Sequence, residues 1–120
     1  MPGLAGARVL VIEGEFVIAV DHQVLLWRFG CEVLGPMASA AEVLVLLRHE
    51  RPDAALLDVG LAGGQAVPVA EALRAAGVPF VLVTGRGPAE PALGGAPRLA
   101  KPCDAGRLRA ALARLLDPAA

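Results

Sequence analysis

Cysteine is scarce in this 120-residue chain, which contains only Cys31 and Cys103. The two residues lie 72 positions apart, so they form neither a Cys-x-x-Cys pair nor a disulfide framework. This spacing removes the support for zinc-ribbon and secreted disulfide-scaffold classes. We expect both residues to be free thiols with packing roles, in a protein of a reducing compartment, the cytoplasm.

Strong charge of one sign and long apolar runs are also missing. The net charge is −1 at pH 7, which gives no electrostatic basis for nucleic-acid binding. Charged residues and glycines interrupt the apolar stretches well short of the ~18 residues that a membrane-spanning helix needs. The first residues lack the basic segment and apolar stretch of a secretory signal peptide. We therefore expect a soluble protein that binds neither nucleic acid nor a membrane.

The chain does contain the material for a core. Apolar residues make up 56% of it and charged residues 19%, and the mean hydropathy is +0.60. This composition excludes global disorder, and the length is that of one domain. We expect residues 1–120 to form a single domain with a packed core over about residues 7–116.

Short apolar runs alternate with helix-like segments along the chain. Five runs are typical of buried strands, at residues 8–12, 31–35, 54–57, 78–83 and 97–100. Helices are expected between them over 16–27, over 40–49 behind a Ser39-Ala-Ala-Glu42 capping box, around 69–76, and after an Asp104 cap. Gly35-Pro36 is expected to end the second strand.

Side-chain spacing predicts which helix faces are buried. In the first helix, four apolar residues recur at near-helical spacing: Phe16, Val20, Val24 and Trp27. We therefore expect Trp27 to lie in the core. The two histidines, His22 and His49, fall in predicted helices and are expected to be surface or hydrogen-bonded groups rather than ligands.

The alternation of strand and helix predicts an α/β protein. Its sheet should be doubly wound, with five parallel strands in the order 2-1-3-4-5, as in flavodoxin-like folds. Residues 86–97 break the pattern because they include three prolines and three glycines. We expect a loop or at most one helical turn there, so that the fourth helix of the alternation is degenerate.

Reactive side chains follow the predicted strands. Ligands of such sheets bind beyond the carboxyl ends of the strands, where Glu13, Asp58, Thr84 and Lys101 are expected to converge. An aspartate can attack a phosphoryl group, while a lysine ammonium and a hydroxyl can bind phosphoryl oxygens. Mg²⁺ prefers oxygen ligands, and the candidates are Glu13, Asp58 and the backbone carbonyl of Gly60.

Four short motifs at these strand ends carry a family resemblance: 11–15 (Val-Ile-Glu-Gly-Glu), 56–59 (Leu-Leu-Asp-Val), 83–85 (Val-Thr-Gly) and 100–102 (Ala-Lys-Pro). Together they resemble the receiver domain of two-component response regulators over about residues 7–116. The resemblance implies a non-enzymatic signalling domain. It makes Asp58 the acceptor of a phosphoryl group from a histidine kinase or phosphotransfer protein. It makes Thr84 the switch hydroxyl and Lys101 the partner of the phosphoaspartate, with the response passed to a downstream protein.

Two positions depart from the family pattern. Receivers usually end the first strand with two adjacent acids, whereas this chain has Glu13-Gly14, which implies a weakened Mg²⁺ site. Arg98 stands where the family usually has Tyr or Phe. A pseudo-receiver that signals by protein contact without phosphorylation is therefore an alternative. A flavodoxin-like binder of a small ligand is disfavoured, because no loop has the density of Ser, Thr and Asn that cradles a flavin phosphate.

Overall fold

The computed structural model describes residues 4–85 and 93–117. Five strands form one parallel sheet in the predicted order β2-β1-β3-β4-β5. The strands are β1 (Arg8–Ile12), β2 (Glu32–Met37), β3 (Ala54–Asp58), β4 (Phe80–Thr84) and β5 (Arg98–Ala100). The α-helices are α1 (Phe16–Arg28), α2 (Ala40–His49), α3 (Ala66–Ala75) and α4 (Ala105–Leu116), and a short 3-10 turn spans Ala62–Gly64.

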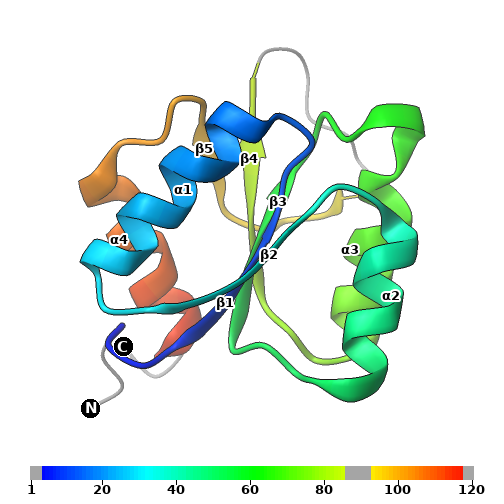
Figure 1. Cartoon of the computed structure of the whole chain (residues 1–120), viewed down its shortest axis with the longest axis horizontal. Coiled ribbons are helices and arrows are strands. Elements are labelled where there is room, and N and C mark those ends of the chain that lie inside the picture. Colours follow the sequence, from blue (N-terminus) through cyan, green and yellow to red (C-terminus); the bar gives the residue numbers. More distant parts are fainter. Residues whose placement is uncertain (1–3, 86–92, 118–120) are drawn as a thin grey trace.

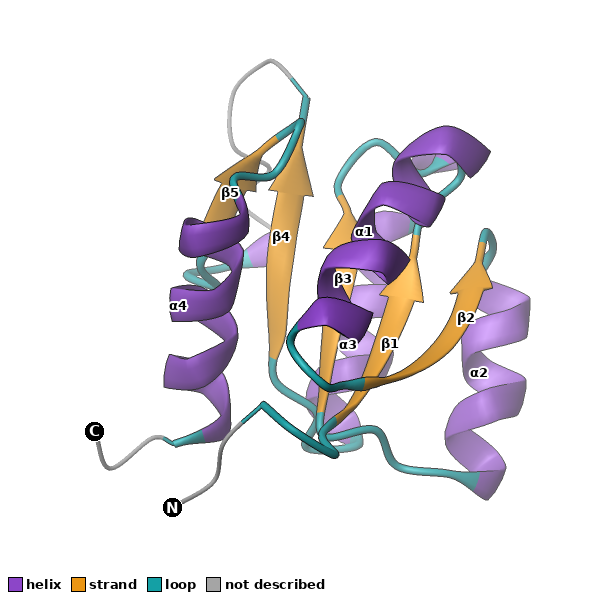
Figure 2. Ribbon diagram, turned by 60° about the vertical axis from the view of Figure 1, so that its left-hand side comes forward, coloured by secondary structure: helices purple, strands orange, loops and turns teal. Residues whose placement is uncertain are grey.

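The helices cover both faces of the sheet. Helices α1 and α4 lie on one face, and α2 and α3 lie on the other (Figures 1 and 2). Alternate residues of the central strands point to opposite layers, so Val9 and Val11 of β1 pack on the α1–α4 side. Leu10 and Ile12 pack on the α2–α3 side. Both faces of β1, β3 and β4 are therefore apolar, which explains why these strands appear in the sequence as continuous apolar runs.

Two helix starts follow the predicted capping chemistry. The Ser39 hydroxyl accepts a hydrogen bond from the backbone N–H of Glu42 at 3.2 Å, at the start of α2. The Glu42 carboxylate reaches back to the N–H of Ala38. At the start of α4, the Asp104 carboxylate accepts from the N–H of Arg107 at 2.9 Å. These bonds satisfy N–H groups that have no partner inside the helix.

The predicted buried face of α1 is wrong. Phe16 is 77% exposed and Trp27 is 58% exposed, so neither lies in the core. The buried residues of α1 are Ala19, His22 and Leu26. Apolar residues surround most of this helix, so spacing alone leaves its rotation ambiguous, and the face with the small Ala19 is the one that packs against the sheet.

Strand β2 continues where the sequence predicted an end. It runs through Gly35-Pro36 to Met37, and the pairing with β1 shifts register between Leu10 and Ile12. The extra residue on β2 forms a bulge, and Gly35 adopts a φ of +91° there. The N–H of Glu13 then donates to the carbonyl of Met37 at 2.9 Å, which extends the ladder to the edge of the sheet where the candidate site lies.

The predicted loop at 86–97 lies partly outside the described residues, because the description stops at residue 85 and resumes at 93. Over residues 93–97 the chain makes no α-helix, and Leu93 is buried with the α2–α3 layer. At the other end, Leu4 and Ala7 are already packed against the α1–α4 layer. The packed region thus begins earlier than the expected residue 7.

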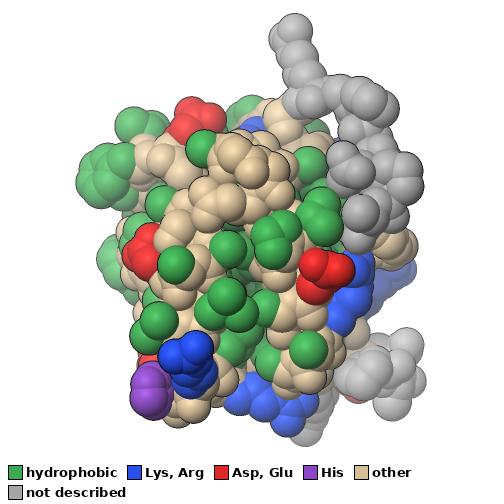
Figure 3. Space-filling model, turned by 90° about the vertical axis from the view of Figure 1, so that its right-hand side faces the viewer, with side chains coloured by type: hydrophobic (Ala, Val, Ile, Leu, Met, Phe, Trp, Pro, Cys, Tyr) green, Lys and Arg blue, Asp and Glu red, His purple; other side chains and the backbone are tan. Residues whose placement is uncertain are grey.

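The outer surface of the α2–α3 layer is seen in Figure 3, where apolar side chains are interspersed with polar and backbone atoms. Helix α2 carries two exposed apolar side chains, Leu44 at 49% and Val45 at 54% exposure. Within the described residues, no helix combines the length and the apolar composition needed to cross a membrane.

The bulge at Gly35 gives a test of the register. A Cβ at Gly35 would lie 2.7 Å from the carbonyl oxygen of Val11, in addition to the strain of its positive φ. Gly63 has a similar φ of +69° but open space around it. We expect Gly63→Ala to lower the free energy of unfolding by about 1 kcal/mol and Gly35→Ala by about 3 kcal/mol. Urea unfolding measures both values, and equal losses would contradict the bulged pairing.

Candidate functional site

Three of the four predicted side chains meet at the carboxyl edge of the sheet. Glu13 follows β1, Asp58 ends β3 and Lys101 follows β5, and parallel strands bring these ends to the same edge. The Lys101 ammonium lies 2.9 Å from Asp58 Oδ1 and 3.0 Å from Glu13 Oε1. We call Glu13, Asp58 and Lys101 the acid–lysine cluster.

The acid–lysine cluster is shielded from water. The exposed fractions of the side chains are 1% for Glu13, 5% for Asp58 and 12% for Lys101. Buried carboxylates are costly unless they are paired and hydrogen-bonded. The single ammonium therefore stabilises two acids that would otherwise repel each other in a medium of low dielectric constant.

Backbone groups complete the environment of the two acids. Asp58 Oδ1 accepts a second hydrogen bond from the N–H of Gly60 at 2.8 Å, and Glu13 Oε2 accepts from the N–H of Glu15 at 3.2 Å. Within the described residues, no N–H group donates to Asp58 Oδ2. Two N–H donors thus hold one oxygen of Asp58, and none of the described N–H groups holds the other.

The two acids differ in their affinity for a proton. Burial raises the pKa of Glu13, and its hydrogen bond with Asp58 raises it further, against the lowering effect of Lys101. Burial also acts to raise the pKa of Asp58, but hydrogen bonds from Lys101, Glu13 and Gly60 hold it below its ordinary value. The pKa of Lys101 is raised because its two acid partners outweigh burial. A proton added to the cluster therefore goes first to Glu13.

Thr84, the fourth predicted residue, is close in the fold but not bonded to the cluster. It ends β4 one position beyond Val83, which pairs with Asp58 in the sheet. Its carbonyl accepts from the N–H of Lys101 at 2.8 Å. Within the described part of the chain, its hydroxyl makes no hydrogen bond to Asp58 or Lys101. The side chain is half-buried, with its hydroxyl available for another partner.

The oxygen atoms present fit a hard divalent cation. Asp58 raises the pKa of Glu13 and Glu13 lowers the pKa of Asp58, so the two acids lie close together. Glu13 Oε1 is buried, and within the described residues its polar partner is the Lys101 ammonium at 3.0 Å. Such an oxygen is suited to a metal ligand, and Mg²⁺ retains waters where protein ligands are few. No group of three or more acids, histidines or cysteines with metal-binding spacing occurs among the described residues, so a metal would have few protein ligands here.

Gly14 has room for a side chain. It stands at the position where the receiver family that the sequence resembles usually has an acid. A Cβ there would meet only Leu61 Cδ2, at 3.9 Å, which is an ordinary contact. Gly14 is exposed and its φ is not positive. The missing acid at this position is therefore a matter of sequence and not of steric exclusion.

Comparison with known proteins identifies the family of this chain. No protein-family model and no curated protein matches the chain. Among solved structures, SdrG from Pseudomonas melonis in its BeF3-activated conformation is 35% identical, with a TM-score of 0.80 and coverage of 93% of this chain and 98% of SdrG. The signal receiver domain of a modulated diguanylate cyclase from Desulfovibrio desulfuricans is 26% identical, with a TM-score of 0.86 and coverage of 94% and 95%.

The response regulator PhyR from Brucella abortus is also similar, at 26% identity and a TM-score of 0.77. The match covers 93% of this chain and 48% of PhyR. The chain belongs to the response-regulator receiver family. Receiver domains act in two-component signalling and interact with histidine kinases or phosphotransfer proteins and with downstream partners. The predicted fold class and family are thereby confirmed.

A buried polar pair beside the site, His22 and Cys103, could not be predicted from the sequence. The surface alternative predicted for His22 is wrong, because the residue is 2% exposed, while the hydrogen-bonded alternative is met at one ring nitrogen. Its Nε2 lies 3.4 Å from the sulfur of Cys103, and its Nδ1 has no hydrogen-bond partner within the described residues. The two residues are 81 positions apart, so no local pattern indicates the contact. It follows from the rotation of α1, which apolar spacing mispredicted.

The dependence of the cluster on its ammonium is testable. We expect Lys101→Met to lower the free energy of unfolding at pH 7 by about 3 kcal/mol, because two buried acids lose their cation. The lowered pKa of Asp58 means that its share of this stability is present above its ordinary pKa and is lost as the pH falls. The difference between wild type and variant should therefore persist from pH 7 down to the ordinary aspartate pKa and shrink below it, toward about pH 3. Urea unfolding at both pH values measures it.

The control is Arg8→Met, which removes ion pairs between partly exposed side chains, Arg8 with Glu32 and with Glu50. We expect a loss below about 1 kcal/mol from it. A Lys101→Met loss that is as large at acid pH as at neutral pH would show that the ammonium does not act through ionised carboxylates.

Proposed function

We propose that this receiver domain accepts a phosphoryl group on Asp58 from a histidine kinase or a phosphotransfer protein. The observation that carries the proposal is the asymmetry of the Asp58 carboxylate. Its Oδ1 is held by Lys101 Nζ at 2.9 Å and by the N–H of Gly60, while Oδ2 has no N–H donor among the described residues. A carboxylate fixed in this way presents Oδ2, the oxygen that no N–H group holds, as the nucleophile.

In the proposed step, Asp58 Oδ2 forms a bond to phosphorus and the bond between phosphorus and the donor's nitrogen or oxygen breaks. The donor atom keeps the electron pair and takes up a proton, which leaves an acyl phosphate on Asp58. The Lys101 ammonium lies within reach of the new phosphoryl oxygens and offsets their charge. The Thr84 hydroxyl, for which the described residues offer no hydrogen-bond partner, would donate to another of these oxygens. The chain acts here as a phosphoryl acceptor and not as an enzyme with a separate substrate.

Glu13, Asp58 and the carbonyl of Gly60 would hold Mg²⁺ in this site. When bound, Mg²⁺ supplies positive charge against the phosphoryl oxygens. The protein's own contribution is to hold both carboxylates at the edge of the sheet. Gly14 offers no side-chain ligand, so we infer a weakened Mg²⁺ site.

A relative and an exposed surface support this function. SdrG, which is 35% identical, has a BeF3-activated conformation, and beryllofluoride has the shape and charge of a phosphoryl group. Phe16 is 77% exposed and Val17 is 71% exposed, and both begin α1 just after Glu13-Gly14-Glu15. Exposed apolar side chains beside a reactive site suit contact with another protein, here the phosphoryl donor.

A second function is favoured by the same cluster. Lys101 already forms ion pairs with both acids, and Gly14 offers no side-chain ligand, so a pseudo-receiver that binds its partner without phosphorylation agrees with the geometry. Phosphorylation of the purified chain separates the two functions.

We expect incubation with acetyl phosphate and Mg²⁺ to add one phosphoryl group slowly, as measured by intact mass spectrometry. Asp58→Asn should abolish the added mass because the nucleophilic oxygen is gone. The control is Asp21→Asn, which removes an exposed carboxylate of α1 and should leave the rate unchanged. No added mass on the wild-type chain after prolonged incubation would refute the proposal and favour the pseudo-receiver.

The weakened metal site predicts a gain of function at position 14. We expect Gly14→Asp to raise the rate of Mg²⁺-dependent labelling by at least about tenfold, because it adds a carboxylate ligand where there is room for one. Gly14→Asn has the same shape without the charge and should raise it much less. Robust wild-type labelling that neither variant changes would contradict the role given to the missing acid.

A further inference from the structure

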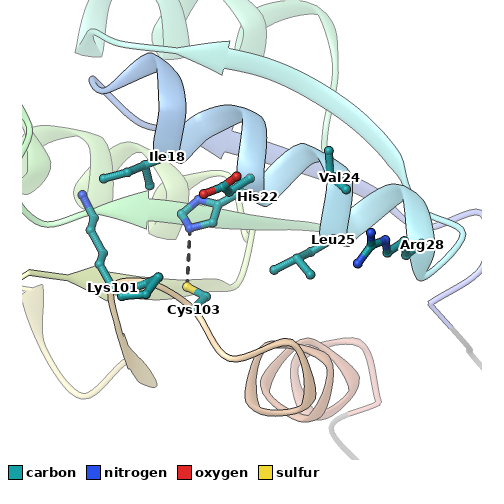
Figure 4. A pocket seen from close by; sticks show the side chains of 9 residues that line it. Ile18, His22, Val24, Leu25, Arg28, Lys101 and Cys103 are labelled. Atoms are coloured by element: carbon teal, nitrogen blue, oxygen red, sulfur yellow. Dashed lines mark hydrogen bonds between the residues drawn. The ribbon is translucent and has the colours of Figure 1, made fainter.

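A groove of about 530 Å³ lies between α1 and the segment that follows β5. Helix α1 forms one wall, and Lys101, Pro102 and Cys103 form the other (Figure 4). The α1 residues that line it are Ile18, Asp21, His22, Val24, Leu25 and Arg28. The volume is within the usual range of about 300–1,000 Å³ for sites that bind small molecules, and Lys101 is the one lining residue that the proposed phosphoryl chemistry uses.

A thiol and an imidazole face each other across this groove. Cys103 Sγ lies 3.4 Å from His22 Nε2, as the dashed line in Figure 4 shows. His22 is 2% exposed, and its other nitrogen has no hydrogen-bond partner within the described residues. A buried nitrogen without a partner costs stability, so the pair is poorly explained as packing alone and points to an occupant of the groove.

Burial and the neighbouring charges keep both the imidazole of His22 and the thiol of Cys103 uncharged. Burial lowers the pKa of His22, and Lys101 lowers it further, while Asp21 and Asp58 act in the opposite direction. Burial raises the pKa of Cys103, with Lys101 opposing and Glu13 adding to the rise. At neutral pH the pair is thus a thiol beside an uncharged imidazole. The tautomer protonated at Nδ1 directs the Nε2 lone pair toward the S–H.

We propose that Cys103 is a site of thiol–disulfide exchange with a small-molecule disulfide, and that His22 Nε2 accepts the thiol proton. The Cys103 sulfur forms a bond to one sulfur of the disulfide, and the disulfide's own S–S bond breaks. The leaving thiolate takes the electron pair and then the proton from His22. Cys103 is oxidised to a mixed disulfide, and one half of the reagent is reduced to a thiol.

The groove suits a disulfide that carries carboxylates on a short organic chain. Ile18, Val24 and Leu25 give it apolar walls, and Arg28 at one end forms no ion pair with any described residue. Arg28 can pair with a carboxylate of the bound half. Because Lys101 lines the same groove, an adduct on Cys103 would border the acid–lysine cluster, and this links the thiol's redox state to the site of phosphorylation.

The second cysteine is an internal control. Cys31 is 6% exposed, has no histidine partner, and directs its sulfur to the carbonyl of Leu4 at 3.4 Å. Cys31→Ala leaves only Cys103 to react, and Cys103→Ala leaves only Cys31. The probe is oxidised glutathione, a disulfide that carries carboxylates. Intact mass spectrometry measures the mixed disulfide formed at pH 7.

We expect Cys103 to react at least about tenfold faster than Cys31, because Cys31 lacks both groove and base. In the Cys31→Ala chain, His22→Gln should lower the rate at pH 7 by about tenfold. That loss should shrink at alkaline pH, because hydroxide then removes the thiol proton without the histidine. A rate unaffected by His22→Gln, or lowered equally at neutral and alkaline pH, overturns the proposal.

Unfolding caused by His22→Gln would also lower the rate, so the fold of this variant is verified by circular dichroism and urea unfolding before the rates are compared. A second measurement needs no histidine variant. The folded Cys31→Ala chain should react faster at pH 7 than the same chain unfolded in urea, although Cys103 is half-buried in the fold. A slower rate in the folded chain also overturns the proposal.

Discussion

The position of one ammonium group between two buried carboxylates sets the chemistry of this receiver domain. Lys101 contacts Asp58 and Glu13 at about the same distance, 2.9 Å and 3.0 Å. Removing either acid leaves the ammonium with one partner, and removing the ammonium leaves two acids facing each other. The two carboxylates and the ammonium therefore stabilise one another as a set. Together they carry a net charge of one negative unit, which an incoming phosphoryl group would meet.

The fold supplies this arrangement through the direction of its strands. Because β1, β3, β4 and β5 are parallel, the residues that follow them reach the same edge. Helices cover both faces of the central strands, so polar side chains can lie outside the apolar core at the ends of these strands. The backbone N–H of Gly60 and the pairing of Lys101 with Thr84 then fix the acids and the lysine in register.

Much of this could be predicted from the sequence. Apolar runs and turn residues located all five strands, and four of the runs lead to the polar residues at the edge: Glu13, Asp58, Thr84 and Lys101. The rotation of α1 could not be predicted, because apolar residues lie on most sides of it and only packing against the sheet selects Ala19, His22 and Leu26 as the buried face. The same uncertainty hid the contact of His22 with Cys103. The bulge in β2 also escaped prediction, since Gly35-Pro36 is as typical of a turn as of a bulged strand.

The bridging ammonium is tested most directly by NMR titration of the side-chain carboxyl carbons of Glu13 and Asp58. The account predicts that Glu13 loses its proton at a higher pH than an exposed glutamate and Asp58 at a lower pH than an exposed aspartate. In the Lys101→Met chain both transitions should move to higher pH. The account would be contradicted if Glu13 and Asp58 titrated like exposed acids and neither transition moved in the Lys101→Met chain.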